Sequence, residues 1–175
     1  ADGVVPVPDH LSFAEAATLP CAALTAWNAI VECGRVKAGD WVLLLGTGGV
    51  SIFALQFAHM MGARTVITSS SDAKLERARA LGADHTINYR TIPEWGTRAR
   101  EITGQRGVDV VLEVGGEETL VQSEAALMRG GTIAAIGLLA GSRIRDVKRV
   151  ASRLHYIRVG NRDQFDDMNR GLPAH

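Results

Sequence analysis

Two glycines and a serine stand at a spacing that could hold a phosphate group. Gly46, Gly48 and Ser51 occupy the fixed positions of a G-x-G-x-x-G turn, with serine at the third; the apolar run 41–45 precedes them and a helical pattern follows. The first glycine of such a turn permits a sharp change of direction, and the second leaves room for a pyrophosphate against the backbone. The third position sets how closely helix and strand pack, and the helix start offers free N–H groups to the phosphates. The pattern predicts dinucleotide binding; a purely structural turn is the alternative.

The residues about 20 positions beyond the first glycine indicate which nucleotide would bind. NAD enzymes usually carry an acid there for the ribose 2′-hydroxyl, but this sequence has Thr68 followed by serines at 69–71. Asp72 comes later and is better explained as a helix cap. Small hydroxyls leave space for a 2′-phosphate, and Lys74 could supply positive charge. The pattern favours NADP over NAD, with a solvated surface lysine as the alternative for Lys74, and it weighs against a methyltransferase that binds S-adenosylmethionine.

Composition narrows the remaining classes. The chain has 175 residues, which suits one domain, and Lys plus Arg equals Asp plus Glu at 19 each. A net charge of zero gives no electrostatic reason to expect nucleic acid or a membrane as partner. The first residues lack the basic start and apolar core of a signal peptide. Two cysteines suggest no disulfide framework, so a cytoplasmic location is expected.

The elements that must position the turn alternate between strand and helix patterns. The lead-in 1–39 predicts a capped helix from Phe13, a break at Pro20 and a second helix at 21–32. Beyond it, strands are expected at 41–45, 65–68, 85–88, 108–114, 132–136 and 154–159, and helices at 49–61, 72–81, 93–103, 117–128 and 163–170. The strands are apolar without clean alternation, which is typical of a parallel sheet buried on both faces. The prediction is a doubly wound α/β Rossmann fold with six strands in the order 3-2-1-4-5-6.

Several stretches carry a resemblance to a known superfamily. They are 17–27, 43–51, 68–75, 81–89 and 130–137. Their joint spacing resembles the medium-chain dehydrogenase/reductase superfamily, most closely its quinone-oxidoreductase-like and zinc-type-alcohol-dehydrogenase-like branches, over almost the whole chain. The resemblance implies hydride transfer between a nicotinamide and a small-molecule carbonyl, quinone or activated alkene. It also implies that residues 1–175 form one dinucleotide-binding domain and that the catalytic domain of the parent enzyme is absent from this sequence.

The resemblance assigns roles to individual positions. It places Lys74, Tyr89, Ser69 and Ser70 at the 2′-phosphate of NADP, and Thr25 near the nicotinamide. It places Val114 and Gly115 on the adenine side, has Ile136, Gly137 and Leu138 hold the carboxamide through backbone groups, and directs Asn161 toward the cofactor. The turn itself contributes Gly46, Thr47, Gly48, Gly49 and Val50.

A metal site and a dimer contact complete the expectations. By its distance from Thr25, Cys21 matches a zinc ligand of the zinc-dependent branch, but a catalytic zinc needs three protein ligands and neither Cys33 nor His10 stands at ligand spacing. A small buried cysteine is therefore the favoured interpretation of Cys21. For the function, the NADP(H)-binding domain of an oxidoreductase is favoured, with the cofactor domain of a zinc-dependent alcohol dehydrogenase as one alternative and a non-catalytic NADP(H)-sensing domain as another. The resemblance also implies a homodimer through the edge strand from Arg153 to Gly160; an edge blunted by arginines is the alternative.

Overall fold

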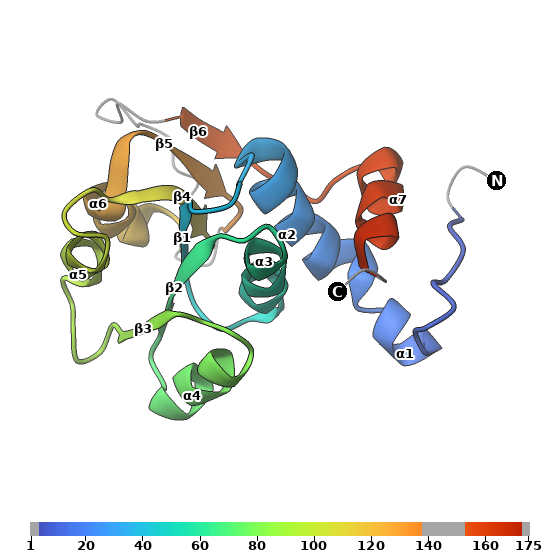
Figure 1. The fold of residues 1–175 in the computed structure, drawn as a ribbon, viewed down its shortest axis with the longest axis horizontal. Coiled ribbons are helices and arrows are strands. Elements are labelled where there is room, and N and C mark those ends of the chain that lie inside the picture. The colour runs from blue at the N-terminus through green and yellow to red at the C-terminus, as the bar shows by residue number, and fades with distance from the viewer. Residues whose placement is uncertain (1–3, 138–152, 173–175) are drawn as a thin grey trace.

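One parallel sheet organises the molecule. The computed structural model describes residues 4–137 and 153–172, and within them six strands follow the order β3-β2-β1-β4-β5-β6, every neighbouring pair parallel. This confirms the predicted doubly wound α/β fold and its strand order (Figure 1). The strands are β1 (Trp41–Leu44), β2 (Arg64–Ser69), β3 (His85–Asn88), β4 (Val108–Glu113), β5 (Leu127–Ala135) and β6 (Arg153–Tyr156).

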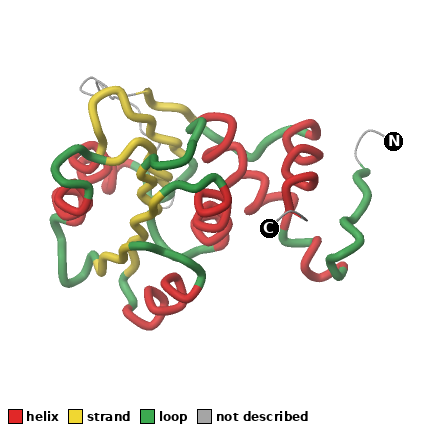
Figure 2. Tube along the Cα trace, viewed as in Figure 1, coloured by secondary structure: helices red, strands yellow, loops and turns green. Residues whose placement is uncertain are grey.

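Helices cover both faces of the sheet (Figure 2). They are α1 (Phe13–Ala16), α2 (Leu24–Trp27), α3 (Gly49–Met60), α4 (Asp72–Ala80), α5 (Trp95–Ile102), α6 (Glu117–Ala126) and α7 (Arg162–Gly171), with wider turns η1 (Leu19–Ala23) and η2 (Asn28–Cys33) on either side of α2. In β1, Val42 and Leu44 pack with residues of α2, α3 and α4, whereas Leu43 packs with residues of α5 and α6. Alternate side chains thus enter opposite cores, and both are apolar.

The helical lead-in differs from the prediction at Pro20. The capping box is present, because Ser12 N donates to Glu15 Oε2 at 2.9 Å and Glu15 N donates back to Ser12 Oγ at 3.3 Å. The two predicted helical segments are separate, but the break lies at residues 17–18 and not at Pro20, because helical backbone runs without a gap from Leu19 to Cys33. Pro20 lies in the first turn, where no carbonyl partner is available for an N–H, so its ring does not interrupt the helix.

The helix predicted at 117–128 and the strand predicted from 132 meet earlier than expected. The helix ends at Ala126 and β5 begins at Leu127. A Cβ on Gly131 would lie 2.9 Å from the Asp109 carbonyl oxygen, and one on Gly107 would lie 2.7 Å from Met128 N. The glycines therefore let β4 and β5 approach closely instead of marking the end of a helix.

The strand predicted at 154–159 stops at Tyr156. Beyond it the backbone leaves the sheet: the Arg158 carbonyl lies 3.4 Å from Thr25 Oγ1, and the Val159 carbonyl accepts from Asn28 Nδ2 at 2.9 Å. This segment leads to α7, which lies on the side of α2 away from the sheet (Figure 1). Across residues 4–137 and 153–172, every helix is too short or too polar to cross a membrane.

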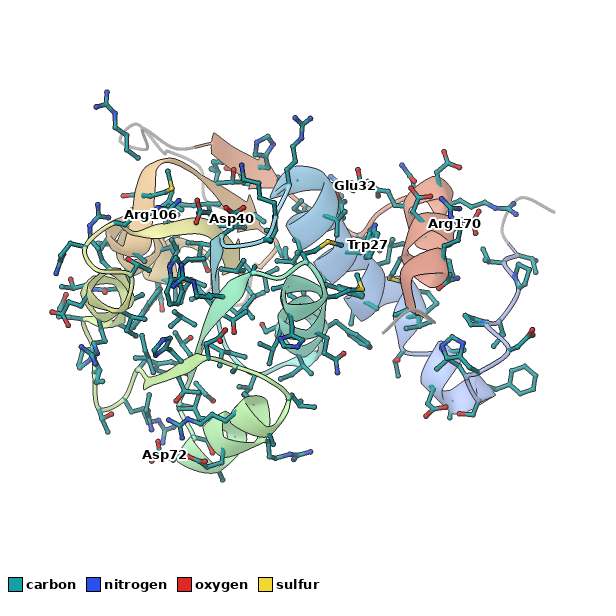
Figure 3. All side chains as sticks on the ribbon, viewed as in Figure 1. Trp27, Glu32, Asp40, Asp72, Arg106 and Arg170 are labelled. Atoms are coloured by element: carbon teal, nitrogen blue, oxygen red, sulfur yellow. The ribbon has the colours of Figure 1, made fainter. Side chains whose placement is uncertain are left out.

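The start of β1 is tied to β4 by a partly buried carboxylate. Asp109 accepts from Trp41 N at 2.8 Å and from both terminal nitrogens of Arg106 at 2.7 Å. Partial burial works to raise the pKa of Asp109, but the hydrogen bonds from Arg106 and Trp41 and the charges of Arg106 and Lys37 outweigh it, so the pKa lies below its ordinary value. Arg106 lies beside Asp40 (Figure 3), whose charge helps to raise the arginine's pKa after the larger effect of Asp109.

Candidate functional site

The glycine turn has the geometry that its sequence predicts. Gly46 has φ +72°, a left-handed conformation that favours glycine. Gly48 is the N-cap of α3, with extended backbone (φ −81°, ψ 175°) and no side chain to satisfy the first helical N–H groups. A Cβ built on either glycine would meet nothing within 4 Å, so the turn faces open space. The residues present therefore fit a pyrophosphate held against the N-terminus of α3.

Ser51, at the third position of the turn, makes a hydrogen bond in addition to being small. Ser51 is buried, and its Oγ donates to the Leu45 carbonyl at 2.6 Å. The hydroxyl therefore satisfies a buried acceptor where β1 ends, which spacing alone did not predict. Behind the turn, a Cβ on Gly49 would lie 3.4 Å from Ala22 Cβ, so the start of α3 packs against η1. Val50, next along α3, is half-buried.

The structure joins the turn to the end of β2. Gly46 N donates to Thr68 Oγ1 at 3.2 Å, and the hydroxyls of Thr47 and Ser69 are 3.2 Å apart. Thr68 and Ser69 are both buried, whereas Ser70 is half-buried. The glycine turn and the end of β2, which the sequence related to each other only through their spacing in known nucleotide-binding proteins, are thus in direct contact. Of the predicted serines, Ser70 is the more accessible to a ligand.

The start of α4 is capped by a different residue from the one predicted. Ser71 is the N-cap, with its Oγ 3.5 Å from Lys74 N, so the expectation that Asp72 caps this helix is wrong. Asp72 instead accepts from Asn88 Nδ2 at 2.7 Å and ties α4 to the end of β3. Tyr89 N in turn donates to the Ser69 carbonyl at 3.0 Å. The ends of β2 and β3 and the first turn of α4 therefore meet at one corner.

Lys74 stands at this corner, beside a cavity of about 190 Å³. Its lining residues are Thr47, Ile52, Lys74, Arg77 and Leu81. Tyr89, a residue that is 41% exposed, follows β3 nearby. Sequence reasoning did not single out Arg77. The available signal was its spacing, because a residue three positions after Lys74 lies on the same face of a helix.

A buried acid shapes the loop after β4. Glu113 is fully buried, and its Oε1 accepts from Gly115 N at 2.7 Å, Gly116 N at 3.1 Å and Thr119 Oγ1 at 2.6 Å. Its Oε2 accepts from the Ser123 hydroxyl. These donors compensate the burial of the carboxylate. Sequence reasoning missed this group; an acid inside an apolar strand, followed by two glycines, was the signal.

The same residue holds the loop after β5 through its backbone. The Glu113 carbonyl accepts from Ile136 N at 2.8 Å and Gly137 N at 3.1 Å. A Cβ on Gly137 would lie 1.6 Å from the Val114 carbonyl oxygen, so the two loops are in close contact. Because both N–H groups are used, Ile136 and Gly137 can offer a ligand their carbonyl oxygens. Leu138 lies outside the described residues.

Thr25 and Asn161 already have partners within the protein. Thr25 is 2% exposed and its Oγ1 donates to the Cys21 carbonyl at 2.6 Å. Asn161 is the exposed N-cap of α7: its Oδ1 accepts from Gln164 N at 2.9 Å, and its own N donates to Gln164 Oε1 at 3.0 Å. Both side chains therefore have a structural role. Because the Thr25 hydroxyl proton is donated to Cys21, a ligand can bond to Thr25 only as a hydrogen-bond donor to its oxygen.

The cysteine that the sequence associated with zinc is free and exposed. The expectation of a buried Cys21 is wrong, because η1 buries the face carrying Leu19 and Ala23, and Cys21 lies on the other side. Within residues 4–137 and 153–172, no three His, Cys, Asp or Glu side chains are grouped so that they could hold a metal ion. The described residues thus do not form a complete zinc site, since catalytic zinc needs three protein ligands.

Comparisons with known proteins identify the family and the fold of the chain. The family model for zinc-binding dehydrogenases matches residues 49–169. A zinc-type alcohol dehydrogenase-like protein of Schizosaccharomyces pombe (strain 972 / ATCC 24843) is 48% identical over 178 residues, covering 96% of this chain and 51% of that protein. The chain therefore spans about half the length of this relative.

Two solved structures share the fold. An NAD-dependent alcohol dehydrogenase superposes with a TM-score of 0.85 at 34% identity, covering 97% of this chain and 51% of the other. The 2-octenoyl-CoA carboxylase reductase CinF, solved in complex with NADP and 2-octenoyl-CoA, superposes with a TM-score of 0.84 at 28% identity, covering 96% of this chain and 43% of the other. The family match and these likenesses confirm the resemblance to the medium-chain dehydrogenase/reductase superfamily.

Proposed function

Because the chain belongs to the zinc-binding dehydrogenase family, we propose that it is the NADP(H)-binding domain of an oxidoreductase. The observation that carries the proposal is the contact between the glycine turn and an acid-free end of β2, the 3.2 Å approach of Thr47 to Ser69. Both Lys74 and Tyr89 stand beside that contact. In this proposal residues 1–175 act as one dinucleotide-binding domain, in which η1 packs against the start of α3 through Ala22 and Gly49.

The roles of the residues follow from their places along the sheet. The pyrophosphate lies over Gly46 and Gly48 at the start of α3, where N–H groups are free. The adenosine lies toward β2 and β3, and its 2′-phosphate meets Ser70, Lys74 and Tyr89. The nicotinamide lies on the other side of the turn, toward Thr25 and the loop at 136–137. Gly46, Ser70, Tyr89 and the loop at 136–137 follow the carboxyl ends of parallel strands, where open α/β sheets bind ligands.

The chemistry of the bound cofactor is hydride transfer at the nicotinamide. The part of this chain is to hold the dinucleotide extended across the sheet and to fix the ring against the β5 loop. We propose a carbonyl, quinone or activated alkene as the hydride acceptor. The bound enoyl thioester of the related reductase, an activated alkene, supports that class. NAD in another relative's name makes cofactor preference the point to test first.

Titration with both cofactors tests the proposal. We expect NADPH to bind at least about tenfold more tightly than NADH, the difference expected from one charge-assisted contact to the 2′-phosphate. Lys74→Ala should reduce that preference while leaving NADH binding unchanged. Isothermal titration calorimetry on the protein measures both constants. Equal affinity for the two cofactors, or no binding of either, would falsify the NADP assignment.

A homodimer through β6 is a second element of the proposal. In the described sheet β6 pairs with β5 on one side and its other edge faces outward. An unpaired edge can bind a second copy of the same strand, and two-fold pairing would cover both edges at once. Light scattering coupled to size-exclusion chromatography gives the mass in solution. A monomer at all concentrations, or a dimer that survives proline substitution in β6, counts against this contact.

A further inference from the structure

The cavity beside the glycine turn is lined by two cations. Lys74 and Arg77 come from successive turns of α4, and Thr47 comes from the glycine turn opposite. Of the described residues that line it, none is acidic. The Thr47 hydroxyl on one wall is also the group that lies 3.2 Å from Ser69. The cavity therefore opens where β2 ends, at the place that a ribose 2′-substituent reaches in this kind of fold.

The other charges of α4 already have partners. Arg79 forms an ion pair with Glu76 and a hydrogen bond to the Thr86 hydroxyl. The Asp72 carboxylate accepts a hydrogen bond from Asn88. Among the interactions of the described residues, none pairs the side chain of Lys74 or Arg77. Two like charges on adjacent turns of a helix repel each other, so this face gains most from an anion between them.

The chemistry of the two side chains differs in a way that suits a phosphate monoester. A lysine ammonium is a point charge, whereas a guanidinium presents a fork that can donate to two oxygens of one phosphate. A hydroxyl at Thr47 can donate to the third oxygen. We propose that Lys74 and Arg77 together form a clamp for the 2′-phosphate of NADP, with Arg77 as a second specificity-determining residue. This inference rests on the proposed function and extends it to a residue outside the recognised stretch.

The experiment compares three single substitutions in the protein: Arg77→Ala, Lys74→Ala and Arg79→Ala. Arg79→Ala is the matched control, because it removes the same charge from the same helix but outside the cavity. Dissociation constants are measured for NADPH, NADH, 2′,5′-ADP and 5′-AMP. We expect Arg77→Ala to weaken NADPH and 2′,5′-ADP by about 10- to 100-fold, the range for a lost charge-assisted contact, with NADH and 5′-AMP changed by less than about twofold. We expect Arg79→Ala to change all four by less than about twofold.

The substitution Arg77→Lys and added salt refine the result. Arg77→Lys should restore part of the NADPH affinity, because the charge returns without the fork. Raising the ionic strength should weaken 2′,5′-ADP binding more steeply in the wild type than in Arg77→Ala. Circular dichroism spectra that overlay for all variants would show that α4 is intact.

The outcomes distinguish the proposed role of Arg77 from the proposed preference for NADP. If the wild type prefers NADPH and Lys74→Ala loses that preference while Arg77→Ala keeps it, the clamp is wrong and the NADP assignment stands. If Arg77→Ala weakens the binding of NADPH and NADH equally, or if Arg79→Ala weakens NADPH binding as much as Arg77→Ala does, then Arg77 acts through the overall charge of the protein or through its folding. Either result overturns the inference. If the wild type binds both cofactors equally, the proposed function itself fails.

Discussion

Replacing Glu113 by glutamine tests how the loops at the carboxyl end of the sheet are held. The carboxylate is fully buried, and the polar groups around it are two backbone N–H groups and two hydroxyls. Glutamine keeps the shape and one acceptor oxygen. If that oxygen takes the place of Oε1, its three hydrogen bonds change from charge-assisted to neutral. The new NH₂ then faces the Ser123 hydroxyl, which can rotate to accept.

The magnitude follows from those three bonds. A hydrogen bond to a charged group contributes about 1.5–3 kcal/mol and a neutral one about 0.5–1.5 kcal/mol, so the gross loss is about 3 kcal/mol. Relief of the desolvation of a buried carboxylate offsets part of it. We therefore expect Glu113→Gln to lower the free energy of unfolding by about 1–3 kcal/mol. Glu113→Ala leaves buried donors without an acceptor as well as a cavity, and should cost more than about 4 kcal/mol.

Urea unfolding followed by circular dichroism measures these differences in the free energy of unfolding, and the dependence of that free energy on urea concentration should be the same for all variants. Glu118→Gln is the matched control, since it removes an exposed carboxylate from α6, the helix that carries Thr119 and Ser123, and should change the free energy of unfolding by at most about 0.5 kcal/mol. NADPH affinity should fall with Glu113→Gln in parallel with NADH affinity, because the loop at 114–116 lies away from the 2′-phosphate. A Glu113→Gln protein as stable as the wild type would refute the reasoning, because the carboxylate would then give the loop nothing that an amide cannot.

Three further outcomes follow from single groups. Gly48→Ala should change the free energy of unfolding by no more than about 0.5 kcal/mol, because the φ of Gly48 is negative and an added Cβ meets no protein atom. The same substitution should weaken the binding of NADPH and NADH equally in calorimetry, because the methyl group enters the space for the phosphates. Ser51→Ala should cost about 1–3 kcal/mol in urea unfolding, because a buried carbonyl loses its donor; no change would show that water replaces the hydroxyl. The folded pKa of Asp109 lies below its unfolded value of about 3.9, so its stabilising contribution is complete above that value and is lost as pH falls through the folded pKa. Asp109→Asn should therefore flatten the acid limb of a stability–pH curve below about pH 4, and an unchanged limb would contradict the assignment.

The sheet was predictable because its signals are local. The run 41–45 is wholly apolar and 108–114 is apolar apart from Asp109 and Glu113, so both indicated strands buried on both sides, and the glycines at 62 and 82 marked helix ends. The start of β5 was not predictable in the same way. Gly130 and Gly131 were interpreted as a helix stop, whereas the close approach of Gly131 to the Asp109 carbonyl is a contact between segments that are distant in sequence.

The candidate site also contains some residues that local spacing predicts and others that only the packing of the fold places. Spacing located Gly46, Thr47 and Ser69, and the fold brings them together. The hydrogen bonds of Glu113 and the position of Arg77 in a cavity wall depend on how α6 and α4 lie against the sheet. Neither is a property of a local pattern. Cys21 illustrates the limit further, because a periodic helix start predicts which residues share a face but not which face is covered.

The contact between the turn and β2 also constrains how cofactor preference can change. An acid that binds a ribose 2′-hydroxyl must replace one of the serines at the end of β2. At Ser69 a carboxylate would occupy a buried position and would replace the hydroxyl that lies 3.2 Å from Thr47, so the phosphate cradle would be disturbed with the ribose site. At Ser70, which is half-buried and has no such contact, the acid can reach solvent and a ribose without burial. Cofactor choice in this chain is therefore separable from phosphate binding at Ser70 and coupled to it at Ser69, because one pair of hydroxyls joins the two halves of the site.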